Sequence, residues 1–97
     1  MSGSNIQSPF RPGTSQVKAY TGTAGTITNG VGAQTYVVRV WCSTAAYIAF
    51  GASPTATTND IPVPANTPEY FIVTPGQKVS AIQQSSGGNL YVTEMTR

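Results

Sequence analysis

Histidine is absent from this 97-residue chain, and Cys42 is its single cysteine. A Ser-His-acid triad would therefore lack its base, Cys and His ligands for a zinc ion cannot gather, and an intrachain disulfide has no second thiol. A reactive thiol needs a basic or cationic neighbour, so we expect Cys42 to be a small buried residue at a strand end. We predict no bound metal and no cofactor.

Acidic residues are also scarce, because Asp60, Glu69 and Glu94 are the only three. Glu69 and Glu94 fall on different predicted strands, and on neighbouring strands they could form a carboxylate pair of the kind that glycosidases use. Such carboxylates are more often solvated or paired with a cation such as Lys78. The glycine-rich stretches lack the strand, loop and helix context that binds a phosphate. We therefore predict that the chain is not an enzyme.

Charge of either sign is low, since charged residues make up 8% of the chain, against about 25% in an ordinary soluble domain. The five basic residues are scattered along the sequence, so the basic stripe that nucleic-acid binding needs is missing. No apolar segment approaches the length of a membrane span. The N-terminus also lacks the basic and apolar regions of a signal peptide. We expect no direct nucleic-acid partner, no membrane partner, and synthesis in a cytoplasm.

Threonine, serine, asparagine and glutamine supply most of the polar side chains instead. Thr favours strands because its branched Cβ fits a pleated surface, and no window has an apolar 3.6-residue repeat that would predict a significant helix. Seven or eight short runs with turn signals between them predict an all-β fold, a small antiparallel β-sandwich or jelly-roll-like domain over residues 14–97. Residues 1–13 are polar and rich in Gly and Pro, and we predict a flexible N-terminal arm there.

The last thirty residues have the clearest strand pattern. Three runs are rich in β-branched and aromatic residues, and Pro-Gly and Ser-Gly-Gly turn signals separate them. The runs are 68–74, 77–84 and 89–96. We predict a three-stranded antiparallel meander with a core face made of Tyr70, Ile72, Val79, Ala81, Leu90 and Val92. The opposite face would also be apolar, with Phe71, Val73, Ile82 and Tyr91. Two apolar faces indicate a second buried surface, which an oligomer can supply.

Residues 35–42 form the strongest single strand in the sequence. Alternation places four of their side chains in the core, namely Tyr36, Val38, Val40 and Cys42. The other face then holds Thr35, Val37, Arg39 and Trp41. A surface Trp beside an Arg is typical of a protein interface; alternatively, Trp41 caps the end of the core. Residues 45–50 are predicted to follow as the paired strand.

The segment 51–67 contains three prolines and no helical period. Proline permits an edge strand at 61–64 but not a central one, and a long loop in a small domain is often functional or a crossover between sheets. Its candidate contact residues are Thr57, Asn59, Asp60 and Ile61. In the arm, the candidates are Ile6, Phe10 and Arg11, which could dock on a neighbouring subunit. Alternatively, the arm packs on its own domain or stays mobile.

Several segments between residues 36 and 97 resemble small structural proteins of tailed bacteriophages. They are 47–51 with its Gly51 turn, 54–56, 62–71 with Pro-Glu-Tyr-Phe, 73–79 with Pro-Gly-Gln-Lys-Val, and 90–96. The resemblance implies a capsid decoration, or cement, protein that is made in a host bacterium and lies on the outer surface of the virion. Its partners would be the major capsid protein and itself, as a homodimer or homotrimer.

Two other classes of function stay open. A carbohydrate-binding module would present exposed aromatic residues in a row, and Trp41, Tyr47 or Tyr91 could serve. A head-tail or tail-associated component would form rings instead of clusters bound to the shell.

Overall fold

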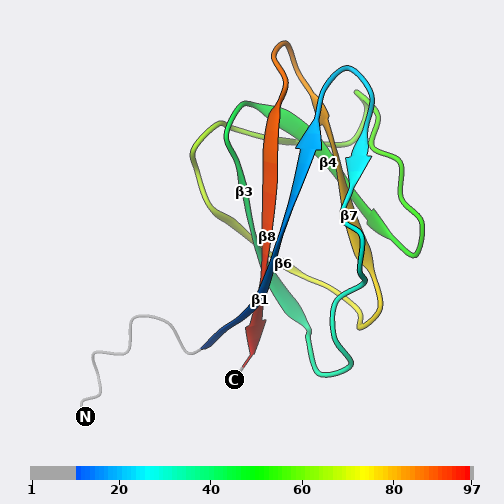
Figure 1. Cartoon of the computed structure of the whole chain (residues 1–97), viewed down its shortest axis with the longest axis vertical. Coiled ribbons are helices and arrows are strands. Elements are labelled where there is room, and N and C mark those ends of the chain that lie inside the picture. The colour runs from blue at the N-terminus through cyan, green and yellow to red at the C-terminus, as the bar shows by residue number, and fades with distance from the viewer. Residues whose placement is uncertain (1–10, 97) are drawn as a thin grey trace.

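The computed structural model describes residues 11–96 and consists of two four-stranded antiparallel sheets packed face to face (Figure 1). Sheet A has the strand order β1-β8-β3-β6, and sheet B has the order β2-β7-β4-β5. The strands are β1 (Arg11–Tyr20), β2 (Gly25–Thr26), β3 (Val37–Cys42), β4 (Ala46–Gly51), β5 (Ile61–Val63), β6 (Glu69–Ile72), β7 (Lys78–Gln83) and β8 (Gly88–Thr96). No helix occurs among these residues, so the predicted all-β class is confirmed.

The pairing follows one rule. The first strand pairs with the last, the second with the seventh, the third with the sixth and the fourth with the fifth. Two further pairings, β3 with β8 and β4 with β7, join these hairpin-like ribbons into sheets. Eight strands in two such sheets form a jelly roll. The chain changes sheet at every connection except the one between β4 and β5.

This topology corrects two predicted pairings. The three C-terminal runs are strands, but β7 belongs to sheet B while β6 and β8 belong to sheet A, so they form no meander. The strand at 45–50 likewise lies in sheet B and does not pair with β3. The predicted turn at Pro75-Gly76 exists: Gly76 has a φ of 91°, and the Gln77 N–H donates to the Thr74 carbonyl at 3.1 Å. Turn residues predict that the chain reverses its direction, but they do not predict which sheet the next strand joins.

The core lies between the sheets and contains most of the predicted side chains, including Val38, Val40, Cys42, Val79, Ala81, Leu90 and Val92. Phe50 from sheet B and Phe71 from sheet A meet across it, with ring centroids 5.1 Å apart. At one end, the Tyr20 hydroxyl donates to the Thr44 carbonyl at 2.6 Å and ties β1 to the connection after β3. Full burial of a Val or Leu side chain, such as Val38 or Leu90, stabilises the fold by roughly 1.5–3 kcal/mol.

Three residues predicted in the core are exposed instead: Tyr36, Tyr70 and Ile72. β6 is apolar on both faces, so alternation alone allows either orientation. Its register with β3 sets Phe71 beside the fully buried Val38, and Phe71 therefore points inward. Tyr36 precedes β3, where the alternation of the strand does not yet apply.

The strand positions bear on two further predictions. β5 lies at the edge of sheet B and contains Pro62, as the edge-strand prediction requires. β1 begins at Arg11, so residues 11–13, predicted as the end of the arm, belong to a strand, and residues 1–10 lie outside the described residues.

Candidate functional site

The outward side of sheet A is unusually apolar. An antiparallel sheet that packs one face on a core commonly presents polar side chains on the other. Here four large apolar side chains are exposed on that side, with exposed fractions of 56% for Val17, 53% for Tyr70, 88% for Ile72 and 36% for Tyr91. We call this surface the sheet A face; it comprises Ser15, Val17, Val37, Arg39, Trp41, Tyr70, Ile72, Tyr91 and Thr93.

The register of the ladders arranges these side chains in rows across the sheet. Arg39 lies between Tyr70 on β6 and Thr93 on β8. In the next row, Trp41 lies beside Tyr91, whose other neighbour is Val17 on β1. Because partners in a row point to the same side, residues far apart in the sequence form one continuous surface.

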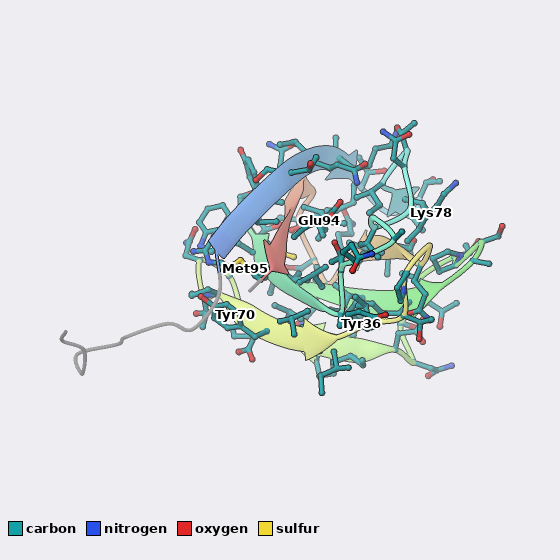
Figure 2. All side chains as sticks on the ribbon, turned by 90° about the horizontal axis from the view of Figure 1, so that it is seen from below. Tyr36, Tyr70, Lys78, Glu94 and Met95 are labelled. Carbon is teal, nitrogen blue, oxygen red and sulfur yellow. The ribbon has the colours of Figure 1, made fainter. Side chains whose placement is uncertain are left out.

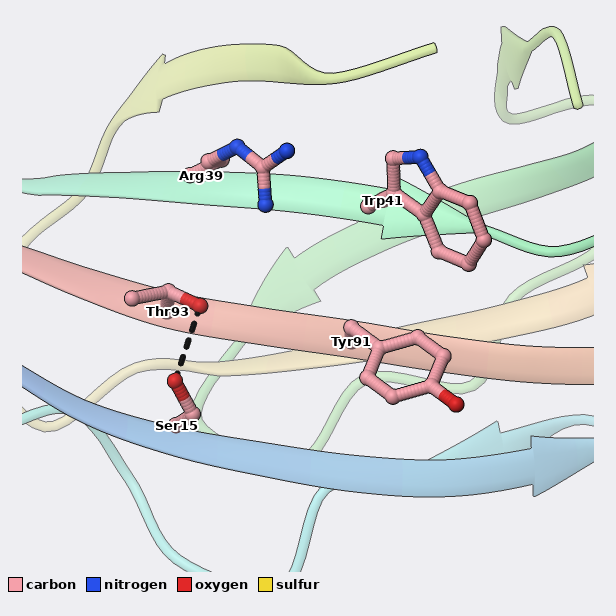
Figure 3. Close-up of a pocket in the computed structure, with 5 residues that line it drawn as sticks. All are labelled: Ser15, Arg39, Trp41, Tyr91 and Thr93. Carbon is pink, nitrogen blue, oxygen red and sulfur yellow. Dashed lines mark hydrogen bonds between the residues drawn. The ribbon is translucent and has the colours of Figure 1, made fainter. Parts of the chain in front are cut away.

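A shallow hollow of about 390 Å³ lies at the centre of this face (Figure 3). Its lining consists of Ser15, Arg39, Trp41, Tyr91 and Thr93. The rings of Trp41 and Tyr91 meet edge to face with centroids 5.3 Å apart, and the hydroxyls of Ser15 and Thr93 share a hydrogen bond of 2.9 Å. We call this feature the Arg39 hollow. It combines a cation, two aromatic rings and two hydroxyls in an open site.

Arg39 is the only charged residue among the described side chains on the sheet A face. Alternation places Glu69 and Glu94 on the opposite side of their strands, and the Glu94 carboxylate accepts hydrogen bonds from the Thr35 hydroxyl and, at 3.1 Å, from the Gly32 N–H. Asp60 lies in the connection before β5. Lys78 and Tyr70 lie on opposite sides of the molecule (Figure 2). The described part of the face therefore carries one positive charge in apolar surroundings.

The outer side of sheet B differs because the chain itself covers part of it. The Ala56 N–H donates to the Ser80 Oγ at 3.0 Å, and the Thr26 hydroxyl donates to the Pro54 carbonyl at 3.0 Å. Both Ala56 and Ser80 are buried. The long connection between β4 and β5 thus packs on sheet B, and the most exposed apolar surface is left on sheet A.

Comparison with known protein families, with curated proteins and with solved structures finds no match for this chain. Within residues 11–96, no helix has the length and apolar character needed to cross a membrane. Those residues also contain no cluster of three or more His, Cys, Asp or Glu side chains that could hold a metal ion.

The predicted contact residues separate into three groups. Arg39 and Trp41 lie together in the Arg39 hollow, and Trp41 stands on the outer face instead of capping the core. The loop candidates Thr57, Asn59, Asp60 and Ile61 lie before and at the start of β5, on the other sheet. Ile6 and Phe10 lie outside the described residues, and Arg11 begins β1.

The loop group forms a turn with hydrogen bonds between its own residues. The Thr57 N–H donates to the Asp60 carboxylate at 2.7 Å, the Asp60 N–H donates to the Thr57 carbonyl at 3.1 Å, and the Asn59 N–H donates to the Thr57 hydroxyl at 3.3 Å. Hydrogen bonds of this kind, from Asp and Thr side chains to the nearby backbone, are sufficient to explain why the chain turns here.

Sequence reasoning missed Val17, Tyr70 and Ile72 as members of the exposed surface. The available signal for Tyr70 and Ile72 is the apolar character of both faces of the segment 68–74, and the prediction assigns these two faces the wrong way round. The Trp41–Tyr91 contact had no local signal, because the two residues are fifty positions apart and meet only through the β3–β8 register.

Glu69, Glu94 and Cys42 all lie on the inward side of sheet A. Glu69 and Glu94 lie on β6 and β8, which are separated by β3, and their register partners are Val40 and Val38. Strand spacing and rise then put their Cα atoms about 12 Å apart. Cys42 is buried, and burial raises the pKa of its thiol to about 11. The thiol is therefore protonated at neutral pH, and the prediction of a small buried residue is confirmed.

Proposed function

We propose that this chain is a structural protein of a bacteriophage virion, of the capsid decoration type. In this proposal it binds the outer surface of the capsid shell and stabilises contacts between major capsid subunits. The phage assignment comes from the resemblance of residues 36–97 to such proteins. The single observation that carries the docking role is the exposed apolar sheet A face, with the Arg39 hollow at its centre.

The residue types on this face support a protein partner. Trp, Tyr and Arg are the types enriched at the energetic centres of protein interfaces, and Arg39, Trp41 and Tyr91 line the hollow together. Ile72 and Val17 extend the apolar surface to either side of it. A contiguous exposed apolar patch on a small protein commonly marks an interaction site.

The mechanism of such a protein is mechanical. An interface of ordinary size, on the order of 800 Å² per partner, would hold a jelly roll over the junction of two shell subunits. The two sheets make the domain a rigid block, so separating the subunits would require breaking this added interface. Repetition at many equivalent positions on the shell would multiply a modest contribution from each copy.

A carbohydrate-binding module is the second candidate, and the Arg39 hollow is the observation that favours it. Two aromatic rings and two hydroxyls in an open site suit the apolar and polar faces of a sugar ring, and jelly rolls occur in lectins as well as in capsids. A sugar in the hollow would leave Ile72 and Val17 in water, however. Those two side chains favour the larger footprint of a protein.

Co-sedimentation with purified capsids of the phage that encodes the chain tests the docking role. We expect the wild-type protein to pellet with capsids and Ile72→Asp to remain in the supernatant, because a carboxylate would be buried in the apolar contact. Ser53→Asp is the matched control, since Ser53 is exposed in the connection that covers sheet B. Equal binding by both variants would refute docking through the sheet A face. Binding to a glycan array without binding to capsids would select the carbohydrate alternative.

Self-association into a dimer or trimer stays a prediction. Light scattering on the full chain and on a variant without residues 1–10 measures it. A discrete oligomer that is lost on truncation would assign the arm to contacts between copies, and rings instead of compact oligomers would favour the head-tail alternative.

A further inference from the structure

We propose that the Arg39 hollow receives the carboxylate of an Asp or Glu side chain, which the shell protein presents from an otherwise apolar surface. The inference rests on the proposed docking role and specifies the chemistry of the partner at the centre of the contact. It is carried by the position of a permanent charge in the middle of the surface that docking would cover.

The guanidinium of Arg39 cannot escape the cost of burial by losing its proton, because arginine stays charged in proteins. Arg39 is already half-buried between Tyr70 and Thr93, and a partner that covers Ile72 and Tyr91 on either side must also cover it. A buried charge without a partner is strongly unfavourable. A stable contact therefore requires a negative group opposite Arg39.

None of the three acidic side chains supplies that group on the described part of the sheet A face. Glu94 is hydrogen-bonded to Thr35 and Gly32 on the inward side of β8, Asp60 is bonded within its own turn, and Glu69 alternates with the outward-pointing Tyr70. Hence the carboxylate must come from the partner.

The side chains of the hollow suit a carboxylate that is carried on methylene groups. In Figure 3 the guanidinium and the Trp41 ring lie along β3, with Thr93 and Tyr91 opposite them on β8. The planar fork of an arginine binds both oxygens of a carboxylate. In the Ser15–Thr93 pair only one hydroxyl donates to the other, so the second keeps a proton for the incoming oxygen. The two aromatic rings can pack on the methylene groups of the same side chain.

The same observations exclude a second copy of this chain as the occupant. Two sheet A faces packed together would each present Arg39 and would bring no acidic side chain to meet it. Like charges at an interface disfavour association. An acidic sugar would satisfy Arg39, but it would leave Ile72 exposed.

The test measures the affinity for capsids as a function of salt concentration, with three variants. Arg39→Gln removes the charge, Arg39→Lys keeps the charge but loses the fork, and Lys18→Gln is the matched control because Lys18 is an exposed cation on β1 outside the hollow. We expect Arg39→Gln to weaken binding at least about 30-fold and to flatten its salt dependence. Arg39→Lys should lie between this variant and the wild type, and Lys18→Gln should stay within about twofold of it.

The outcomes separate the inference from the docking role. If Arg39→Gln binds as tightly as the wild type while Ile72→Asp does not bind, the face docks but receives no carboxylate, and the inference is wrong. If the wild type does not bind capsids at all, the proposed function fails and the inference fails with it. If the free protein binds a soluble oligosaccharide of uronic acids, and Arg39→Gln abolishes that binding but leaves capsid binding unchanged, the hollow belongs to an acidic glycan and the inference is wrong. Urea unfolding of each variant verifies that any loss of binding is not a loss of fold.

Discussion

Trp41 and Tyr91 meet edge to face on the outer side of sheet A, with ring centroids 5.3 Å apart and ring planes at 67° to each other. Such aromatic pairs contribute about 0.5–1.5 kcal/mol beyond the burial of their area. A pair of this kind belongs in a core or an interface, yet here it lies on an open surface beside Arg39. On the proposed docking role, this pair lies inside the surface that a partner would cover.

Two isoleucines show how far the core differs from the outer face of sheet A. Ile48 on β4 is fully buried, whereas Ile72 on β6 is 88% exposed. We predict that Ile48→Ala lowers the free energy of unfolding by about 2–5 kcal/mol, and that Ile72→Ala changes it by less than about 0.5 kcal/mol. Urea unfolding followed by circular dichroism measures both. A large loss for Ile72→Ala would mean that the isolated protein already buries this face.

Gly25 is a position where the backbone leaves no room for a side chain. A Cβ there would collide with the carbonyl oxygen of Ala19, which cannot rotate away as a side chain can. We predict that Gly25→Ala destabilises the fold by about 1–3 kcal/mol or more. Gly22→Ala is the control, because its Cβ would meet only the Gln83 side-chain nitrogen at 3.7 Å. Thermal unfolding should rank the two clearly, and equal melting temperatures would contradict the close approach of β1 and β2.

Alkaline pH should destabilise the protein through Cys42. Burial raises the pKa of the Cys42 thiol from its ordinary value of 9.0 to about 11, and burial also raises the pKa of Tyr20. The unfolded chain then releases these protons first, so the stabilisation is complete below pH 9 and is lost as the pH rises toward 11. The loss for Cys42 is up to roughly 2–3 kcal/mol.

The measurement for this prediction is the free energy of unfolding of the wild type and of Cys42→Ala from pH 8 to about pH 11. The variant should be less stable at neutral pH, because it leaves a small cavity, and its stability should fall less steeply above pH 9. Parallel curves for the two proteins would show that the thiol does not titrate in the unfolding equilibrium.

The sequence predicts individual strands and turns well, but it does not predict how strands far apart in the sequence pair with one another. The strand at 37–42 was predictable because one apolar alternation runs along its length, and the Pro75-Gly76 turn was predictable because a turn with φ above zero favours glycine. The sheet of β7 was not predictable, since the same turn can lead to a neighbouring strand or to the opposite sheet. The choice between Tyr70 and Phe71 as the core residue likewise depends on the register with β3, which joins residues about thirty positions apart.

For the candidate site, period-two alternation on one strand was sufficient to place Arg39 and Trp41 together. The rest of the surface required pairing between distant strands. Tyr91, Thr93 and Ser15 join Arg39 only because β8 lies between β1 and β3. The strand order β1-β8-β3 cannot be predicted from local patterns in a single sequence.

Trp41 provides the most direct test of the central claim, because it is the only tryptophan of the chain and lies in the Arg39 hollow. The protein can be made with hydroxytryptophan at this position, whose fluorescence is excited at wavelengths that the tryptophans of the capsid do not absorb. The measurement is the quenching of this fluorescence by acrylamide, with and without capsids. We predict that capsid binding lowers the quenching constant several-fold, as the sheet A face becomes covered. Unchanged quenching of protein that has pelleted with capsids would contradict the account, because the chain would then dock through another surface.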